Sequence, residues 1–203
     1  MARIFIVMGK SATGKDTIYK QLLTSAELQL KTAVIYTTRP KRSAEREGVE
    51  YHFVDEAALL EFKAQNKIIE HRFYDTVHGR WHYFTVNDGQ IDLDRFDYLM
   101  IGTLASYLQI RAYYGDEKVV PIYLEVEDGV RLLRAMDRER NQGVPKYAEV
   151  CRRYLADEED FSEENLVKAG IVKRYCNHEM EECLHKIRQD IKNFTVNCRN
   201  NVI

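Results

Sequence analysis

A short segment near the N-terminus has the residue types and the spacing needed to bind a polyphosphate. Four residues separate Gly9 from Gly14, and Lys15 follows directly. Glycines let the backbone curl so that successive N–H groups point inward at an anion, and a lysine there bridges neighbouring phosphates. An ordinary glycine turn is the alternative, but the spacing, the lysine and the position before a helical pattern together favour a phosphate-binding loop. The residues predicted to bind phosphate are Gly9, Ser11, Thr13, Gly14, Lys15, Asp16 and Thr17.

Asp16 departs from the usual form of this loop. Serine or threonine normally stands at this position and lends its hydroxyl group to magnesium. A carboxylate beside phosphates is unfavourable unless a cation lies between them. We therefore predict that Asp16 helps to hold Mg²⁺, directly or through water, while Thr17 keeps a phosphate contact.

The loop lies between a predicted strand and a predicted helix. Residues 3–8 form a mostly apolar run that is typical of a buried parallel strand, and residues 15–23 have helical periodicity. Further strands are predicted at residues 32–36, 49–54, 67–70, 81–86, 98–101, 119–124 and near 170–172 or slightly beyond, with a turn at His78–Gly79. Further helices are predicted at residues 56–65, between Gly102 and about 114, at 128–138 with Asp128 as N-cap, up to about 161, and at 178–191. This alternation predicts an α/β fold whose helices cover both faces of a parallel sheet.

The bulk composition argues against several classes of protein. The formal net charge is -2 over 203 residues, so no overall basic field points to nucleic acid as a partner. The apolar run at residues 4–8 is too short for a signal peptide or a membrane span, and no later segment is a better candidate. The cysteines form no Cys-x-x-Cys pair, which favours free thiols in a cytoplasmic protein; they are Cys151, Cys176, Cys183 and Cys198.

Four cysteine and histidine side chains within ten residues could instead be zinc ligands. However, residues 178–191 have the pattern of an amphipathic helix. On that helix Cys183 falls on or beside the apolar face, while His178 and His185 lean elsewhere. The spacing matches no standard zinc module, so we favour a buried thiol over a metal site.

A second segment is more specific than the phosphate loop. Residues 37–53 read TTRPKRSAEREGVEYHF and resemble, without a gap, the pattern TTRxxRxxExxGxxYxF of the guanylate kinase family. The resemblance implies that Arg39, Arg42 and Tyr51 hold the phosphate of an acceptor nucleotide, and that Glu45 and Gly48 shape the loop. The residues alone support a weaker form of this inference, because two arginines beside a tyrosine hydroxyl suit capture of a dianion. A basic surface turn is the alternative.

The resemblance continues with less fidelity further along the chain. It implies that Glu70 reads the edge of a guanine ring, and that Tyr83 and Thr85 contact phosphate and base. The sequence departs from the family pattern at four positions. Phe84 replaces a glycine, Met100 and Gly102 replace an Asp-x-Asp pair, and Ile35 replaces a small hydroxyl residue. These departures leave the identity of the acceptor base open.

The family also brings arginines to the transferred phosphoryl group from a lid between two helices. The corresponding stretch here is residues 134–153. The resemblance favours Arg138 and Arg153 as the catalytic arginines, beside Lys15, and leaves Arg140 and Arg152 as substitutes. A solvated charged face, balanced by the acidic residues 157–160 through helical pairs, is the alternative. Asn177 is a weaker match, to an asparagine beside the adenine of ATP.

The resemblance implies a single domain with a three-layer P-loop NTPase fold. Its core would comprise residues 1–36, 87–138 and 160–192, its inserted NMP-binding lobe residues 37–86 and its lid residues 139–155, while the tail 193–203 is weakly patterned and loosely held. The implied activity is Mg²⁺-dependent phosphoryl transfer from ATP to a nucleoside monophosphate, with GMP or dGMP as the favoured acceptor.

Two other functions stay open. The chain could be a kinase for a different nucleotide, or a non-catalytic guanylate-kinase-like module that binds a nucleotide or a protein. The intact Gly9, Gly14 and Lys15 argue against the non-catalytic module. The expected partners are small-molecule nucleotides, without nucleic acid or membrane, and the sequence does not reveal the oligomeric state.

Overall fold

The computed structural model describes residues 2–76 and 79–199, so the first residue of the turn predicted at His78–Gly79 lies outside the described residues. A parallel sheet forms the core. Its strands, in spatial order, are β6 (Tyr98–Ile101), β1 (Ile4–Met8), β7 (Val119–Glu125) and β8 (Arg174–Cys176). All five residues of β1 are buried, because strands flank it on both sides and helices cover both faces.

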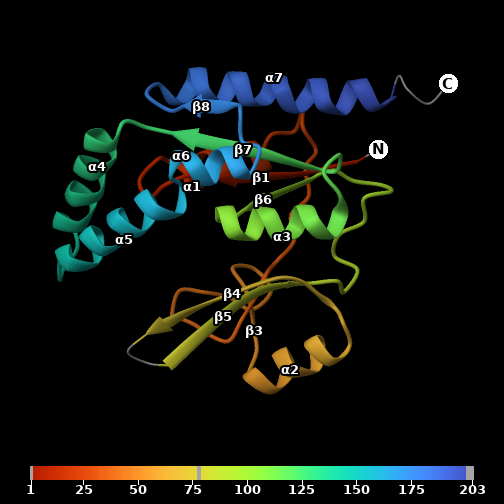
Figure 1. Cartoon of the computed structure of the whole chain (residues 1–203), viewed down its shortest axis with the longest axis horizontal. Helices are drawn as coiled ribbons and strands as arrows, with labels where there is room; N and C mark the ends of the chain where they lie inside the picture. The colour runs from red at the N-terminus through yellow and green to blue at the C-terminus, as the bar shows by residue number, and fades with distance from the viewer. Residues whose placement is uncertain (1, 77–78, 200–203) are drawn as a thin grey trace.

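Helices cover both faces of this sheet, as the alternating pattern predicts. The side chains of Phe5 and Val7 pack with α1 (Lys15–Leu23) and α7 (Met180–Arg199). Those of Ile4, Ile6 and Met8 point the other way, toward a cluster that includes residues of α3 (Leu104–Tyr114) and α6 (Glu163–Lys168). The sheet therefore lies between two helical layers, with α7 above and α3 below it in Figure 1. The predicted three-layer α/β fold is confirmed.

A second, smaller sheet lies below α3 in Figure 1. Its strands, in spatial order, are β3 (His52–Phe53), β2 (Tyr36–Thr37), β5 (Gly79–Val86) and β4 (Ile68–Thr76). The helix α2 (Glu56–Ala64) packs on one face of it, where Leu59 and Phe62 meet Phe84 and Val86. Strands β4 and β5 form an antiparallel hairpin that is longer than predicted on both sides.

Two helices project at the left edge of Figure 1, α4 (Asp128–Arg140) and α5 (Tyr147–Asp160). The intervening loop is shorter than predicted, because Glu139 and Arg140 still belong to α4. Glu139 is buried, and its carboxylate accepts hydrogen bonds from the Lys146 backbone N–H at 2.5 Å and the Gln142 side chain at 3.1 Å. These contacts connect the end of α4 to the start of α5 across the loop between them.

Several predicted boundaries are wrong for identifiable reasons. Of residues 32–36 only Tyr36 is in a strand, because the backbone N–H and C=O of Val34 bond to the side chain of Gln90 instead of to a neighbouring strand. Of residues 49–54 only 52–53 form a strand, since a turn closed by the Gly48 N–H and the Tyr51 C=O precedes it. The short helix α6 was not predicted.

The ends of two helices also differ from the prediction. Glu127, not Asp128, caps α4, because its carboxylate accepts from the backbone N–H groups of Gly129 and Val130. The helix α7 continues to Arg199, so the part of the tail before residue 200 is helical. Cys183 is buried on the apolar face of α7, as predicted. None of the helices in the described part of the chain is long and apolar enough to cross a bilayer.

Candidate functional site

The phosphate loop connects β1 to α1 at the edge of the core sheet. Both of its glycines are required by close packing. A Cβ on Gly9 would lie 2.5 Å from the Leu124 carbonyl oxygen, and a Cβ on Gly14, whose φ is +87°, would lie 2.6 Å from Asn177 Nδ2. Gly14 is the N-cap of α1, so the positive end of that helix faces the loop.

Positive side chains gather beside this helix end. A cavity of about 240 Å³ is lined by Ala12, Gly14, Lys15, Asp16, Thr17, Arg134 and Arg138. Burial lowers the pKa of Lys15, and the positive charges of Arg138 and Arg153 lower it further. The negative charges of Asp16 and Asp157 oppose this shift. The structure therefore brings Lys15 close to both arginines that the sequence singled out, although they lie more than a hundred residues further along the chain.

The arginines of the predicted lid differ in their hydrogen-bond and ion-pair partners. Arg152 and Arg153 both donate to Glu149, with Nε–oxygen distances of 2.8 Å and 2.7 Å. These two hydrogen bonds lower the pKa of Glu149 to about 2. Arg140 pairs instead with Asp137, 3.6 Å away on the same helix. Arg138 is exposed and lines the phosphate cavity.

An ion cluster that the sequence did not predict ties the phosphate loop to α4 and α5. Lys10 pairs with Asp128 and Glu158, while Arg131, only 1% exposed, pairs with Asp128, Asp157 and Glu158. The alternative of a solvated face balanced by helical pairs therefore does not describe Asp157 and Glu158, whose partners lie on the phosphate loop and on α4. Pairs 118 to 148 residues apart leave no signal in a single sequence.

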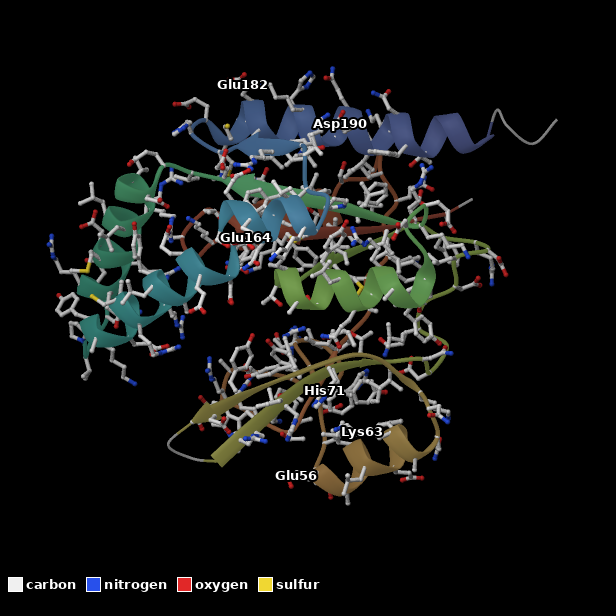
Figure 2. All side chains as sticks on the ribbon, in the orientation of Figure 1. Glu56, Lys63, His71, Glu164, Glu182 and Asp190 are labelled. Carbon is white, nitrogen blue, oxygen red and sulfur yellow. The ribbon has the colours of Figure 1, made fainter. Side chains whose placement is uncertain are left out.

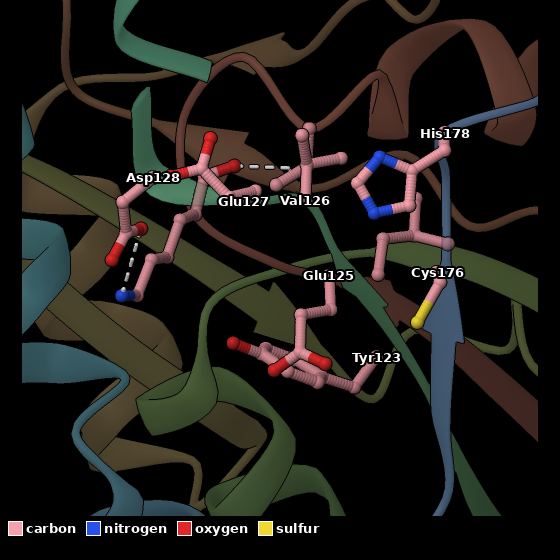
Figure 3. A pocket seen from close by; sticks show the side chains of 10 residues that line it. Tyr123, Glu125, Val126, Glu127, Asp128, Cys176 and His178 are labelled. Atoms are coloured by element: carbon pink, nitrogen blue, oxygen red, sulfur yellow. Dashed lines mark hydrogen bonds and ion pairs between the residues drawn. The ribbon is translucent and has the colours of Figure 1, made fainter. Parts of the chain in front are cut away.

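Asn177 belongs to the wall of the loop. Its side chain is 2% exposed, and its Nδ2 donates to the Thr13 carbonyl oxygen at 2.7 Å. The contact that the structure gives it is with the loop backbone, so it holds the loop in shape. A cavity of about 390 Å³ adjoins the same part of the loop through Lys10 and Thr13. Figure 3 shows its acidic lining from Glu125, Glu127 and Asp128, opposite Cys176 and His178.

A second group of predicted residues meets on the smaller sheet. Arg39 is 4% exposed, and its guanidinium donates to both oxygens of Glu45, at 2.7 Å and 3.0 Å. The same guanidinium lies over the rings of Tyr51 and Phe53, 5.3 Å and 5.7 Å from their centroids. Glu45 also accepts from the Arg42 backbone N–H, whereas the Arg42 side chain is exposed. Arg39 is therefore fixed in place, and Arg42 is not.

The hairpin holds the residues that were predicted to read a base. Glu70 is 1% exposed and lies across from Thr85, whose hydroxyl donates to Glu70 Oε1 at 3.0 Å. A bulge between Ile68 and Glu70 shifts the register at this point. The ring of Tyr83 lies 5.8 Å from that of Tyr51, which links the hairpin to the Arg39 group.

Arg72 joins this group, and the sequence analysis missed it. Its Nη1 donates to both oxygens of Glu70, at 3.0 Å and 2.9 Å. Burial raises the pKa of Glu70, and the charge of Arg72 opposes that shift. The two-residue alternation of a strand places residues 70 and 72 on one face, and this signal would have found Arg72 had the strand been predicted past Glu70.

Two of the four positions where the sequence departs from the family pattern, Ile35 and Met100, lie between the two sheets. A cavity of about 100 Å³ is bounded there by Ile35, Tyr51, Met100 and Ile101, among others. A Cβ on Gly102 would lie 2.4 Å from Ser106 Oγ, so this backbone has no room for a larger residue at that position. Most of the residues that line this cavity with Tyr51 are apolar.

The donor set at the phosphate cavity fits Mg²⁺. Asp16 and Thr17 supply hard oxygen ligands beside the loop. Among the described residues, no group of three or more His, Cys, Asp and Glu side chains is placed to hold a metal ion by itself. This matches the usual preference of Mg²⁺ for one or two protein oxygens together with nucleotide phosphates and water.

Comparison with known proteins gives these groups a context. Residues 1–85 match the family model described as guanylate kinase. A guanylate kinase of Porphyromonas gingivalis is 26% identical over 203 residues, which cover 96% of this chain and 98% of that protein. One of Chlorobaculum tepidum is 28% identical over 164 residues, 78% of this chain and 81% of that protein. The crystal structure of guanylate kinase from Anaplasma phagocytophilum has a similar fold, with a TM-score of 0.62 at 21% identity over 95% of this chain and 85% of that one.

Proposed function

We propose that the chain is a divergent member of the guanylate kinase family and transfers the γ-phosphoryl group of ATP to GMP or dGMP. An oxygen of the acceptor phosphate attacks the γ-phosphorus, the bond to the bridging oxygen breaks, and ADP leaves. The observation that carries this proposal is that Lys15 and Arg138 line one cavity at the N-terminus of α1, with Arg153 near enough for its charge to lower the pKa of Lys15. Phosphoryl transfer needs mainly charge neutralisation and alignment, and this group supplies both.

The phosphate loop holds the donor. The backbone N–H groups of residues 9–17 and the helix dipole of α1 bind the β- and γ-phosphates, and Lys15 bridges them. Asp16 would hold Mg²⁺, which when bound neutralises charge on these phosphates, and Thr17 would keep a phosphate contact. Arg138 and Arg153 donate to the equatorial oxygens as negative charge shifts toward ADP. Glu149 positions Arg153 until the lid closes.

The smaller sheet holds the acceptor. Arg39, kept in place by Glu45, meets the acceptor phosphate together with Arg42 and Tyr51, while Tyr83 lies between this group and the hairpin. Glu70 and Thr85 meet the base. Because the side chain of Arg42 is exposed, it has room to turn toward the phosphate. The acceptor thus spans from the Arg39 group to the hairpin.

The three parts of the molecule divide this work. We assign residues 37–86 to the NMP-binding lobe, residues 139–155 to the lid, and the remainder to the core. The lid excludes water when it closes over the two nucleotides. The proposed use of ATP and the absence of a Cys-x-x-Cys pair from the sequence support a cytoplasmic location.

The proposal is tested by measuring ADP production by the purified protein with Mg²⁺ and ATP. GMP, dGMP, AMP, IMP, CMP and UMP are compared with the ATP hydrolysis seen without acceptor. We expect turnover with GMP and dGMP that is lost in Lys15→Ala. The matched control is Lys20→Ala, an exposed lysine of the same helix. Absence of turnover with all six acceptors, while ATP still binds, would contradict the proposal.

A further inference from the structure

The β4–β5 hairpin has two chemically different faces. Register pairs Glu70 with Thr85 and Arg72 with Tyr83, so these four side chains form one patch on a single face. The opposite face carries His71, Phe73 and His82. Figure 2 shows His71 above Lys63 of α2, and burial together with the positive charge of Lys63 lowers the pKa of His71. The patch with Glu70 therefore faces away from α2.

Arg72 donates hydrogen bonds to both oxygens of the Glu70 carboxylate. One nitrogen, Nη1, lies 3.0 Å from Oε1 and 2.9 Å from Oε2, between the two oxygens. Thr85 Oγ1 takes a further position on Oε1. A carboxylate has about four lone-pair positions, and these three hydrogen bonds leave one, on Oε2. Glu70 in this arrangement cannot accept two parallel hydrogen bonds from a base.

The pair offers a base one acceptor beside several donors. Arg72 carries five N–H donors in a fixed plane, and only Nη1 bonds to Glu70. Its guanidinium is held over the ring of Tyr83, 5.8 Å from the centroid. An acceptor next to a donor is complementary to an N–H group next to a carbonyl group. In purines that edge is N1–H with C6=O, which guanine and hypoxanthine share.

We propose that Glu70 and Arg72 act as one reading unit for this edge, so that the acceptors are 6-oxopurine nucleoside monophosphates as a class. The inference rests on the proposed function and deepens it. Glu70 Oε2 accepts from N1–H, and Arg72 donates to O6. Adenine presents an acceptor and a donor in the reverse order, so it leaves the buried pair unpaired. The 2-amino group of guanine is not read, and Arg72 is the specificity-determining residue.

The test compares kcat/KM for GMP, IMP and AMP. For the wild-type protein we expect IMP within about tenfold of GMP, and AMP at least about a hundredfold lower. In Arg72→Ala both carboxylate oxygens become free to accept from N1–H and the 2-amino group. The ratio of GMP to IMP should then rise at least about tenfold. Arg80→Ala is the matched control, since Arg80 lies on the same hairpin, pairs with Asp75, is half exposed and packs on Phe73 of the other face.

Two results would overturn the inference. One is a wild-type preference for GMP over IMP of more than about a hundredfold, which is the value expected if Glu70 alone reads both donors. The other is an Arg72→Ala variant that lowers activity with GMP and IMP equally, which would mean that Arg72 only neutralises Glu70. If Arg72→Ala does not fold, the wild-type comparison still decides.

Calorimetric binding of the three nucleotides separates this inference from the proposed function. If no acceptor is phosphorylated, the proposed function fails, but equal affinities for GMP and IMP above that for AMP would still support the reading unit. Binding of AMP as tightly as GMP, or no binding of any of the three, would overturn it.

Discussion

The carboxylate of Asp157 accepts a hydrogen bond from the backbone N–H of Ser11, 2.7 Å away, so a side chain of α5 lies on the phosphate loop. The next residue, Glu158, pairs with Lys10 at 2.8 Å. Backbone N–H groups of such a loop are the groups that bind phosphate. We therefore expect a polyphosphate bound in this loop to meet the negative charge of Asp157, which would couple the position of α5 to nucleotide binding.

The first prediction concerns this contact. We expect Asp157→Asn to tighten ATP binding by about three- to tenfold, because it removes a like charge beside the phosphates. Titration calorimetry with ATP measures the change. Asp160→Asn is the control, since Asp160 is an exposed carboxylate on the same helix. Unchanged or weaker ATP binding in Asp157→Asn would show that the carboxylate does not oppose the nucleotide.

The second prediction concerns Arg131, the buried centre of the ion cluster. Its side chain is 1% exposed and pairs with three carboxylates. Arg131→Met keeps much of the volume but removes one partner from each of three carboxylates. Asp128 and Glu158 keep Lys10 and are partly exposed, whereas Asp157 is more deeply buried, so we expect the free energy of unfolding to fall by about 1–3 kcal/mol.

Urea denaturation of the wild-type protein and of Arg131→Met measures this loss in the free energy of unfolding. Arg140→Met is the control, because Arg140 is 70% exposed and its pair with Asp137 lies on one helix surface. We expect the control to change stability little. A loss in Arg131→Met no larger than that of the control would mean that water already solvates the cluster.

The regular elements of the core could be predicted from the sequence because their signals are local. The apolar run of β1 and the periodicity of α1 each lie within ten residues; α1 has the predicted bounds, and β1 begins one residue later than predicted. The gapless segment at residues 37–53 likewise carried the resemblance to the guanylate kinase family on its own. The chain between the sheets could not be predicted in this way, since side chains such as Gln90 satisfy its backbone groups.

The residues of the candidate site can also be divided into those with a local sequence signal and those without one. Residues that belong to contiguous motifs, such as Lys15, Arg39 and Tyr51, were found, and their roles stay predictions. Arg72 was missed because the predicted strand stopped at Glu70, and Lys10 because its partners lie 118 and 148 residues away. Pairing between distant elements depends on the packed fold, and a single sequence does not record it.

The third prediction concerns the unusual carboxylate of the phosphate loop. If Asp16 holds Mg²⁺ beside the phosphates, Asp16→Ala should weaken ATP binding about tenfold when Mg²⁺ is present. Without Mg²⁺ the same change removes a repulsive charge, so affinity should stay equal or rise. Calorimetry with ATP in Mg²⁺ and in EDTA measures both values, with Asp94→Ala, an exposed carboxylate in the connection before β6, as the control. A loss that does not depend on Mg²⁺ would contradict a metal role for Asp16.

The fourth prediction concerns the pH dependence of folding. Burial, with the positive charge of Lys63 and the neighbouring His82, lowers the pKa of His71 to about 4. In the unfolded chain the pKa of histidine is 6.5, so below that pH the unfolded state binds a proton that the folded state does not. The stability associated with His71 is therefore fully present above pH 6.5 and is lost as the pH falls toward 4.

Replacing this histidine should flatten the pH profile. We expect His71→Leu to reduce the loss in unfolding free energy between pH 6.5 and 4, measured by urea denaturation at half-unit steps. Part of the slope should remain, because burial also lowers the pKa of His82, which bonds to His71 at 2.8 Å. His185→Leu, on the exposed side of α7, should leave the profile unchanged. A profile as steep in His71→Leu as in the wild-type protein would mean that His71 is protonated in the folded hairpin, with Lys63 too far away to prevent it.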